Sequence, residues 1–327
     1  MSRAAHKWKT LSGKSRAAVA LASAGAIAAV TVGVSSASTV APGHDHAPVR
    51  APQSASGKRH PYGLGAVPSK SSWRQSMLRQ SVEPRLEATA PSPNGEAAKP
   101  RKKKRQALPA SVDLTKYAAA PGDQGQVGSC VAWSIDYSAY SILEREQGIS
   151  GGPQAPMYTY SQIVQGQNVG TSPEQHFQIA TTQGVDAKSD YQQGDFDYTT
   201  QPTTSEIANA AKWKLSGFTP LHTGKQIKND VESALSQGEP VTIAIPVYDS
   251  FFYLTPRQAA SYTYYPASGE QYAGGHEITI VGYNSKGVRV ENSWGKGWGD
   301  RGYVNLSWNY LANQVWEANA VGKLVKR

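Results

Sequence analysis

Apolar residues are distributed unevenly along this chain of 327 residues. Pro, Ala, Ser and charged residues dominate before residue 108, whereas Trp, Tyr, Val and Ile recur steadily after it. The first part of residues 108–327 has the spacing of amphipathic helices, which we expect over 130–147, 177–183 and 227–237. A glycine directly follows each of these stretches, as is common after the last turn of a helix.

Strand signals concentrate in the second half of the same region. Runs rich in β-branched residues, bounded by Gly, Pro or Asn, lie at residues 241–245, 277–281, 288–291 and 302–306. Helices first and strands later predict the α+β class, with a helical part and a β part segregated along the chain.

The first 37 residues have the pattern of an export signal. Five Lys and Arg residues come first, residues 17–34 are uncharged and mostly apolar, and small residues precede a cleavage site after Ala37. The apolar run is near the lower length limit for spanning a bilayer and contains mostly Ala, Gly, Ser and Val. We therefore expect a secreted protein. An uncleaved signal is the alternative, and it would leave the chain associated with the membrane or cell wall.

Residues 38–107 predict a disordered, Pro/Ser/Ala-rich basic linker or pro-segment, because they show little hydrophobic periodicity. The basic run 101–105 near its end suits a proteolytic processing site, a contact with anionic cell-wall polymers or lipid, or a solvated tract. Residues 1–107 carry a net charge of +14 and residues 108–327 a net charge of −5. Because the basic balance belongs to the leader, we expect the folded domain, 108–327, to bind no nucleic acid.

The single cysteine, Cys130, excludes an intramolecular disulfide and lies at the predicted start of the first helix. A helix N-terminus favours the thiolate, which is the reactive form of cysteine. Glycines before Cys130 permit a close approach to a substrate carbonyl, and the Cys130 N–H with the Gln124 amide would bind an oxyanion. A buried structural cysteine is the alternative.

Two further motifs complete a candidate catalytic set. His276 follows two glycines, one of them Gly275, and opens a predicted strand where its ring would lie at the edge of a cleft. Asn292 lies in a Gly- and Trp-rich stretch, and its amide can accept the imidazole N–H and fix the tautomer. Trp294 would shield that hydrogen bond from water. Each motif alone fits a structural role, but their joint occurrence in the order Cys, His, Asn favours catalysis.

These motifs resemble those of the papain-like (C1) cysteine peptidase family, in a bacterial secreted form without disulfides. His276 and Asn292 follow Cys130 by 146 and 162 residues, close to the family spacing of roughly 130–150 residues. The sequence NSWG at 292–295, followed by GWG at 297–299, is specific to that family.

The resemblance covers residues 108–324 and implies a papain-like two-subdomain fold. A helical N-terminal subdomain and a β-barrel C-terminal subdomain are expected, with the active site in the cleft between them. The implied roles are nucleophile for Cys130, acid and base for His276, orientation of the imidazole for Asn292, oxyanion donor for Gln124 and shielding for Trp294.

The resemblance also implies positions that bind substrate. Gly170 falls where the family has a glycine lining the cleft, and Gly275 directly precedes the expected base. Glu277 replaces a small apolar residue of the pocket for the second residue before the cut, and a carboxylate there would favour Arg or Lys. Val131 replaces the family's Trp after the nucleophile. The family's long inhibitory helical propeptide is not visible in residues 38–107, so any latency must work differently.

The expected activity is that of a monomeric cysteine endopeptidase that acts on peptide or protein substrates and needs no metal or organic cofactor. An acyl transferase or transpeptidase on the same scaffold remains an alternative, because it shares the acyl-enzyme. A non-catalytic peptide or cell-wall binding module is a second alternative. Loss of the Cys or the His would mark that module, and neither is lost.

Overall fold

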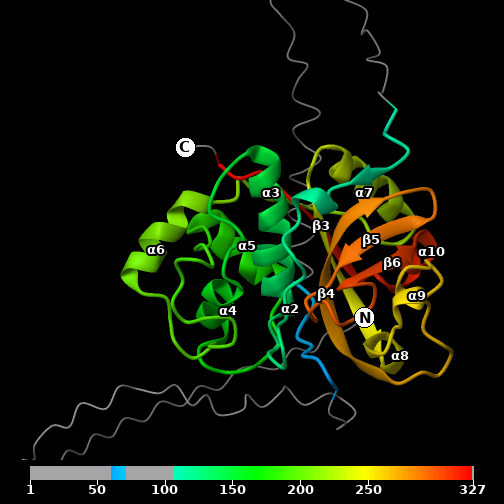
Figure 1. Cartoon of the computed structure of the whole chain (residues 1–327), viewed down its shortest axis with the longest axis horizontal. Coiled ribbons are helices and arrows are strands. Elements are labelled where there is room, and N and C mark those ends of the chain that lie inside the picture. The colour runs from blue at the N-terminus through cyan, green and yellow to red at the C-terminus, as the bar shows by residue number, and fades with distance from the viewer. Residues whose placement is uncertain (1–59, 71–106, 326–327) are drawn as a thin grey trace, which may run out of the picture. The chain divides into compact units, whose positions relative to one another are not determined.

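The computed structural model describes residues 60–70 and 107–325 (Figure 1). The expected signal over residues 1–37 and the basic run 101–105 lie outside the described residues. The α-helical segments are α2 (Cys130–Ala132), α3 (Tyr140–Gln147), α4 (Pro156–Val164), α5 (Pro173–Thr182), α6 (Thr204–Ala210), α7 (Ile227–Ser236), α8 (Asp249–Phe252), α9 (Pro256–Ala259) and α10 (Trp308–Gln314). The strands are β1 (Val112–Asp113), β2 (Phe218–Pro220), β3 (Val241–Tyr248), β4 (Tyr272–Tyr283), β5 (Gly287–Glu291), β6 (Tyr303–Ser307) and β7 (Glu317–Val321). None of the helices in these described ranges is long and apolar enough to cross a membrane.

One continuous helical run carries Cys130 at its first position, as the sequence predicts. It consists of α2, the π-helical segment η3 (Trp133–Ala139) and α3. The π-helical geometry was not predicted, and such segments are frequent at functional sites. The run ends at Gly148, whose φ of 67° is left-handed and costs a glycine little.

The strands form one antiparallel sheet in the order β2-β7-β3-β4-β5-β6, and β1 pairs with β4. The four predicted strands correspond to β3, β4, β5 and β6. Short β1 and β2 were not predicted, and neither was β7, whose sequence EANAV has only one β-branched residue.

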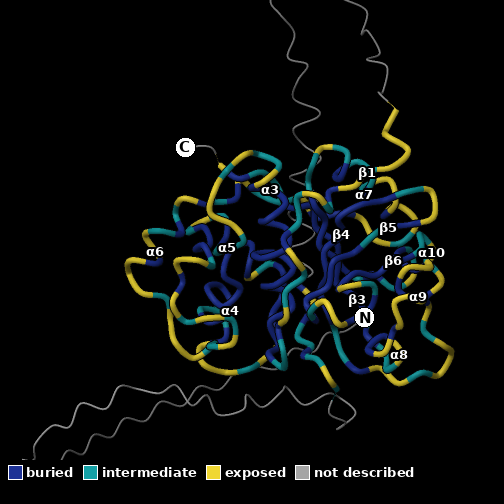
Figure 2. The backbone as a smooth tube through the Cα atoms, viewed as in Figure 1, coloured by how far each residue is buried: buried dark blue, intermediate teal, exposed yellow. Residues whose placement is uncertain are grey.

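The helical part and the sheet part bury separate apolar clusters. One cluster centres on Cys130, α4 and α5, and the other on β3, β4, β5 and β6. In Figure 1 the first lies on the left and the sheet on the right, with α2 and α3 between them. Figure 2 shows that the backbone is buried along β3 and β4, next to this central helix. The predicted α+β class with two segregated parts is therefore confirmed.

Residues 60–70, which we call the strap, are ordered along the line where the two parts meet. The strap is the short blue stretch of Figure 1. Its main chain bonds to Gly125 on the helical side and to Gly275 on β4. The expectation of disorder is therefore wrong for residues 60–70. The other residues of the expected linker, 38–59 and 71–106, lie outside the described ranges.

Candidate active site

His276 and Asn292 form the hydrogen-bonded pair that the sequence analysis expects. The His276 Nε2 lies 2.8 Å from Asn292 Oδ1, and both side chains are buried. Asn292 Oδ1 also accepts the Ser293 N–H, so the imidazole Nε2 carries the proton and donates it. The other ring nitrogen, Nδ1, has no hydrogen-bond partner in the described part of the chain. A neutral His276 therefore has its lone pair on Nδ1, where it can accept a proton.

The Cys130 side chain is fully buried. It lies against the main chain of Glu277, which follows His276 on β4, and of Gly65 in the strap. Burial raises the pKa of the thiol to about 12, and the Glu277 carboxylate also raises it, while main-chain hydrogen bonds lower it. Burial lowers the pKa of His276 to about 4, although the bond to Asn292 acts in the opposite direction. With the strap in place, both groups are therefore neutral at neutral pH.

The strap places a main-chain carbonyl on Gln124. The Gln124 Nε2 donates to Gly63 O at 3.2 Å and to Val127 O at 2.8 Å. The Gln124 Oε1 accepts the Ser293 hydroxyl at 2.7 Å, which fixes the orientation of the amide. A donor on a rigid, buried amide can stabilise an oxyanion.

The strap forms main-chain hydrogen bonds with β4 on one side and with the helical part on the other. Gly65 N and Ala66 N both donate to Gly275 O at 3.1 Å. On the opposite side, Thr171 N donates to Gly65 O at 2.8 Å, and Val67 N donates to Thr171 O at 3.0 Å. Gly170, the residue expected to line the substrate site, lies so close that an added Cβ would be 2.7 Å from Gly65 O. An extended peptide is thus held by main-chain bonds on both sides.

Trp294 covers the imidazole, as expected from the sequence. Its ring stacks on His276 with the centroids 4.5 Å apart and the planes inclined by 23°. The Trp294 Nε1 also donates to Gly63 O at 3.3 Å, and the Tyr62 ring of the strap stacks on the Trp294 ring with the centroids 4.9 Å apart. This aromatic stack excludes water from the His276–Asn292 bond.

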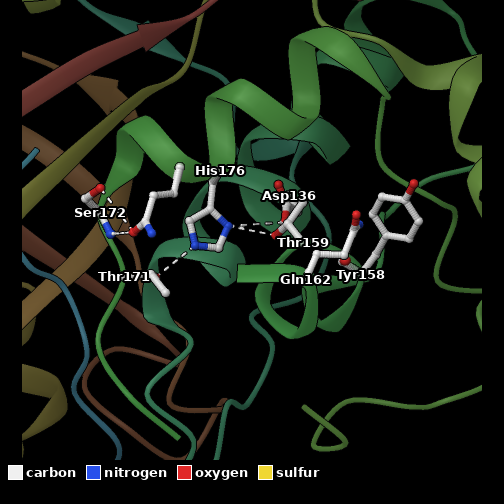
Figure 3. A network of polar contacts seen from close by, with 8 residues as sticks. Asp136, Tyr158, Thr159, Gln162, Thr171, Ser172 and His176 are labelled. Atoms are coloured by element: carbon white, nitrogen blue, oxygen red, sulfur yellow. Dashed lines mark hydrogen bonds and ion pairs between the residues drawn. The ribbon is translucent and has the colours of Figure 1, made fainter. Parts of the chain in front are cut away.

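A second buried polar network lies behind Thr171 (Figure 3). Thr171 Oγ1 is 2.9 Å from Nε2 of His176 on α5, and the His176 Nδ1 is 2.7 Å from Thr159 Oγ1 on α4. The Thr159 hydroxyl donates in turn to Asp136 on η3. These four side chains are completely buried. The network connects the residue that pairs with the strap to the helix that carries Cys130.

Glu277 lies in the same sheet as a second glutamate, Glu317. Ala244 on β3 is opposite Glu277 on β4 and opposite Glu317 on β7. Residues directly opposite in antiparallel strands project from the same face, so these three side chains form a row. Both glutamates are only 1% exposed. Among the described residues, no group of three or more His, Cys, Asp and Glu side chains is arranged to hold a metal ion.

Sequence reasoning missed three parts of this site: the strap, Thr171 and Glu317. Thr171 directly follows Gly170, which was expected to line the substrate site, so its position in the sequence could have identified it as a site residue. The strap and Glu317 lie far from the motifs in sequence and reach the site only through long-range pairing.

The fold, with Cys130 at the start of the central helix and His276 paired with Asn292, is that of the papain-like cysteine peptidases. Residues 108–321 match the family model described as "Papain family cysteine protease", and the chain belongs to this family of cysteine-type peptidases.

Individual relatives agree with this assignment. A protein of Acanthamoeba polyphaga mimivirus described as an uncharacterized peptidase C1-like protein is 25% identical over 219 residues, which cover 62% of this chain and 70% of the viral one. Cysteine proteinase 2 of Entamoeba histolytica is 29% identical over 214 residues, covering 61% of this chain and 63% of that protein. Cathepsin K of Gallus gallus is 28% identical over 248 residues, covering 72% and 69%.

The fold has solved counterparts. The crystal structure of xylellain, a cysteine protease from Xylella fastidiosa, superposes with a TM-score of 0.62 at 19% sequence identity. The superposition covers 82% of this chain and 99% of xylellain. At this identity the likeness concerns the fold, which is that of a two-subdomain papain-like protein.

Proposed function

We propose that this chain is an exported cysteine endopeptidase that hydrolyses peptide bonds through a thioester intermediate. The observation that carries the proposal is the Gly63 carbonyl, 3.2 Å from Gln124 Nε2, on a strap that also touches the Cys130 thiol. A peptide carbonyl thus lies on the donor that an oxyanion needs, next to a nucleophile and a base. Export is supported by the signal pattern of residues 1–37.

The proposed reaction has two stages, acylation and deacylation. The Cys130 thiol gives its proton to His276 Nδ1, and the thiolate sulfur forms a bond to the substrate carbonyl carbon. Gln124 Nε2 and the Cys130 N–H stabilise the negative oxygen. The C–N bond then breaks as the imidazolium protonates the leaving amine, which leaves a thioester. A water molecule, deprotonated by His276, attacks the thioester and releases the carboxylic acid and the thiol.

The strap supports a latent form of the enzyme. Gly63 and Gly65 approach the helical part so closely that an added Cβ would be 2.4 Å from Val127 O and 1.9 Å from Gly128 O, respectively. Substrate cannot pair with Gly275 and Thr171 while the strap does. Release of the strap therefore precedes activity, and cleavage at the basic run 101–105 would separate it from the domain.

The substrate class that we propose is a peptide with Arg or Lys near the cut. Ser69 of the strap donates its N–H and hydroxyl to the two oxygens of Glu317 at 3.0 and 2.8 Å. A guanidinium fork would supply the same two donors. Glu277 lies on the same face across Ala244, and its charge reaches Cys130, so the recognised side chain lies close to the scissile bond.

The activity is tested on the full chain under reducing conditions with a mixed peptide library. In the Gly65→Ala variant the added Cβ should displace the strap, so this variant is expected to cleave the peptides without a lag. The unmodified chain and Lys70→Ala, a strap control with an exposed side chain, should show a lag. Cys130→Ser should abolish cleavage. No cleavage and no labelling of Cys130 by a thiol-directed epoxide would contradict the proposal and favour a binding module. If the epoxide labels Cys130 but products form only when an amine is added, and those products are amides of that amine, the result would favour an acyl transferase.

Selectivity is tested with peptides that differ only in the second residue before the cut. Arg should be preferred to its neutral isostere citrulline by roughly tenfold or more, since buried charge pairs discriminate strongly. Glu317→Gln and Glu277→Gln should each reduce that ratio. Glu144→Gln, a buried glutamate bonded to Gln154 in the helical part, should leave it unchanged. Equal rates for the two peptides would exclude this substrate class without affecting the proposed chemistry.

Export is tested by sequencing the N-terminus of the secreted protein. A first residue at 38 supports signal cleavage alone, and one near 106 supports further processing at the basic run. Retention of residue 1 in the membrane fraction would indicate an uncleaved anchor.

A further inference from the structure

Thr171 is the residue through which the helical part pairs with an extended peptide. It lies in the loop between α4 and α5, and both its N–H and its C=O bond to the strap. These two bonds form only when a peptide is present. The orientation of the Thr171 peptide planes without a peptide must therefore be fixed in another way.

The Thr171 side chain supplies that fixation. It is fully buried, and its hydroxyl lies 2.9 Å from His176 Nε2. A β-branched residue has few χ1 rotamers, so a fixed hydroxyl also restricts the main chain that carries it. Figure 3 shows Thr171 on one side of the imidazole, with Thr159 and Asp136 on the other.

His176 is anchored at both ring nitrogens. Its Nδ1 is 2.7 Å from Thr159 Oγ1, and the Thr159 hydroxyl bonds to Asp136 on the helix of Cys130. The single Thr159 hydroxyl proton goes to Asp136, so Thr159 Oγ1 accepts from His176 Nδ1–H, and the unprotonated Nε2 accepts the Thr171 hydroxyl. The imidazole is thus a fixed spacer between the peptide-pairing loop and the catalytic helix.

We infer that His176 is a positioning residue: through Thr171 it holds the edge with which an extended peptide pairs, and so sets the affinity for strap and substrate. This inference rests on the proposed function, and His176 takes no part in bond making or breaking. Removal of the bond should weaken peptide binding and leave the chemical step unchanged.

The test uses the full chain carrying Gly65→Ala, with active sites counted by epoxide titration. His176→Phe and Thr171→Val each remove the bond, and each should raise KM by about fivefold to tenfold, the value of one neutral hydrogen bond, with kcat unchanged. His176→Gln, which can restore one bond, should recover part of the loss. The double variant should be no worse than either single one, because both remove the same interaction. His222→Phe, at an exposed histidine, is the control.

Two readouts separate this inference from its alternatives. In the chain without Gly65→Ala, Thr171→Val should shorten the lag, since the strap uses the same bonds. In a Cys130→Ala, Gly65→Ala chain, calorimetry should show the same loss of affinity for a peptide, whether or not the enzyme hydrolyses it. Unchanged KM and affinity with fewer titratable sites would mean that His176 only stabilises the fold, and would overturn the inference. Additive effects in the double variant would also overturn it.

Discussion

Two fully buried histidines, His276 and His176, differ in how their rings are bonded. His276 bonds only through Nε2, to Asn292, and its Nδ1 has no partner in the described part of the chain. His176 bonds through both nitrogens, to Thr171 and Thr159. Burial lowers the pKa of each, to about 4 for His276 and about 3 for His176. Burial therefore does not distinguish the two residues, whereas the unbonded nitrogen does.

The difference teaches what a base requires beyond an imidazole. A nitrogen that already has a partner cannot accept a proton from a nucleophile without breaking that bond. The second difference is what buries each ring: His276 lies under Trp294 and next to the strap, whereas His176, on α5, lies where α5 packs against α4 and η3. The proposed release of the strap would expose His276 to substrate, whereas His176 would stay buried inside the helical part.

The largest expected effect comes from replacing the histidine with the unbonded nitrogen. In the Gly65→Ala chain, His276→Ala should lower kcat/KM by about 10³-fold or more, because it removes both the base and the acid. Initial rates with a fluorogenic peptide measure this loss. His222→Ala is the matched control and should retain full activity. Retention of more than a tenth of the activity in His276→Ala would contradict the role of base.

A smaller loss is expected when the ring is kept but its partner is removed. Asn292→Ala should lower kcat by roughly tenfold, as expected for one buried hydrogen bond that orients the ring, while KM changes little. Asn313→Ala, on the exposed end of α10, is the control. An equal loss for Asn292→Ala and His276→Ala would indicate that the ring is displaced altogether.

Local sequence was sufficient to predict His276 as a site residue, but it was not sufficient to predict His176. Cys130, His276, Asn292, Gln124 and Trp294 occur in motifs whose spacing is readable without a fold. His176 occurs in an ordinary amphipathic helix, and only the packing of α5 against α4 and η3 places it between two threonines. Its role depends on contacts that periodicity does not encode.

The same reasoning applies to the strands and the strap. The β-branched strands β3 to β6 were predictable, but β7 has little strand propensity of its own and is held by pairing with β2 and β3. The strap, which is rich in Gly and Pro, has the composition of a linker. Its order comes from bonds to Gly125, Gly275 and Thr171, which are between about 60 and 210 residues away in the chain.

The free energy of unfolding of the wild-type chain should depend on pH in a way that the His176→Gln variant does not. The pKa of His176 is about 3 in the folded chain and roughly 6.5 in the unfolded chain, so the unfolded state binds more protons between these values. The stabilisation by neutral His176 is therefore complete above about pH 6.5 and falls by up to about 1.4 kcal/mol per pH unit below it. Denaturant unfolding at pH 8 and pH 5 should show that the advantage of the wild-type chain over His176→Gln shrinks at pH 5. A constant difference would contradict the buried neutral form.

The smallest expected effect concerns the segments that bury the two histidines. Water reaches His276 once the strap is displaced, and hydration favours the imidazolium, so the pKa of His276 should rise from about 4 by roughly one unit or more in Gly65→Ala. The pKa of His176 should remain near 3, because its cover belongs to the domain itself. NMR titration of the two ring Cε1–H signals in both chains measures this directly. A rise at both residues would mean that Gly65→Ala loosens the helical part as a whole, and no rise at His276 would mean that Trp294 alone accounts for its burial. Only a rise confined to His276 shows that its burial, unlike that of His176, is imposed by a removable segment.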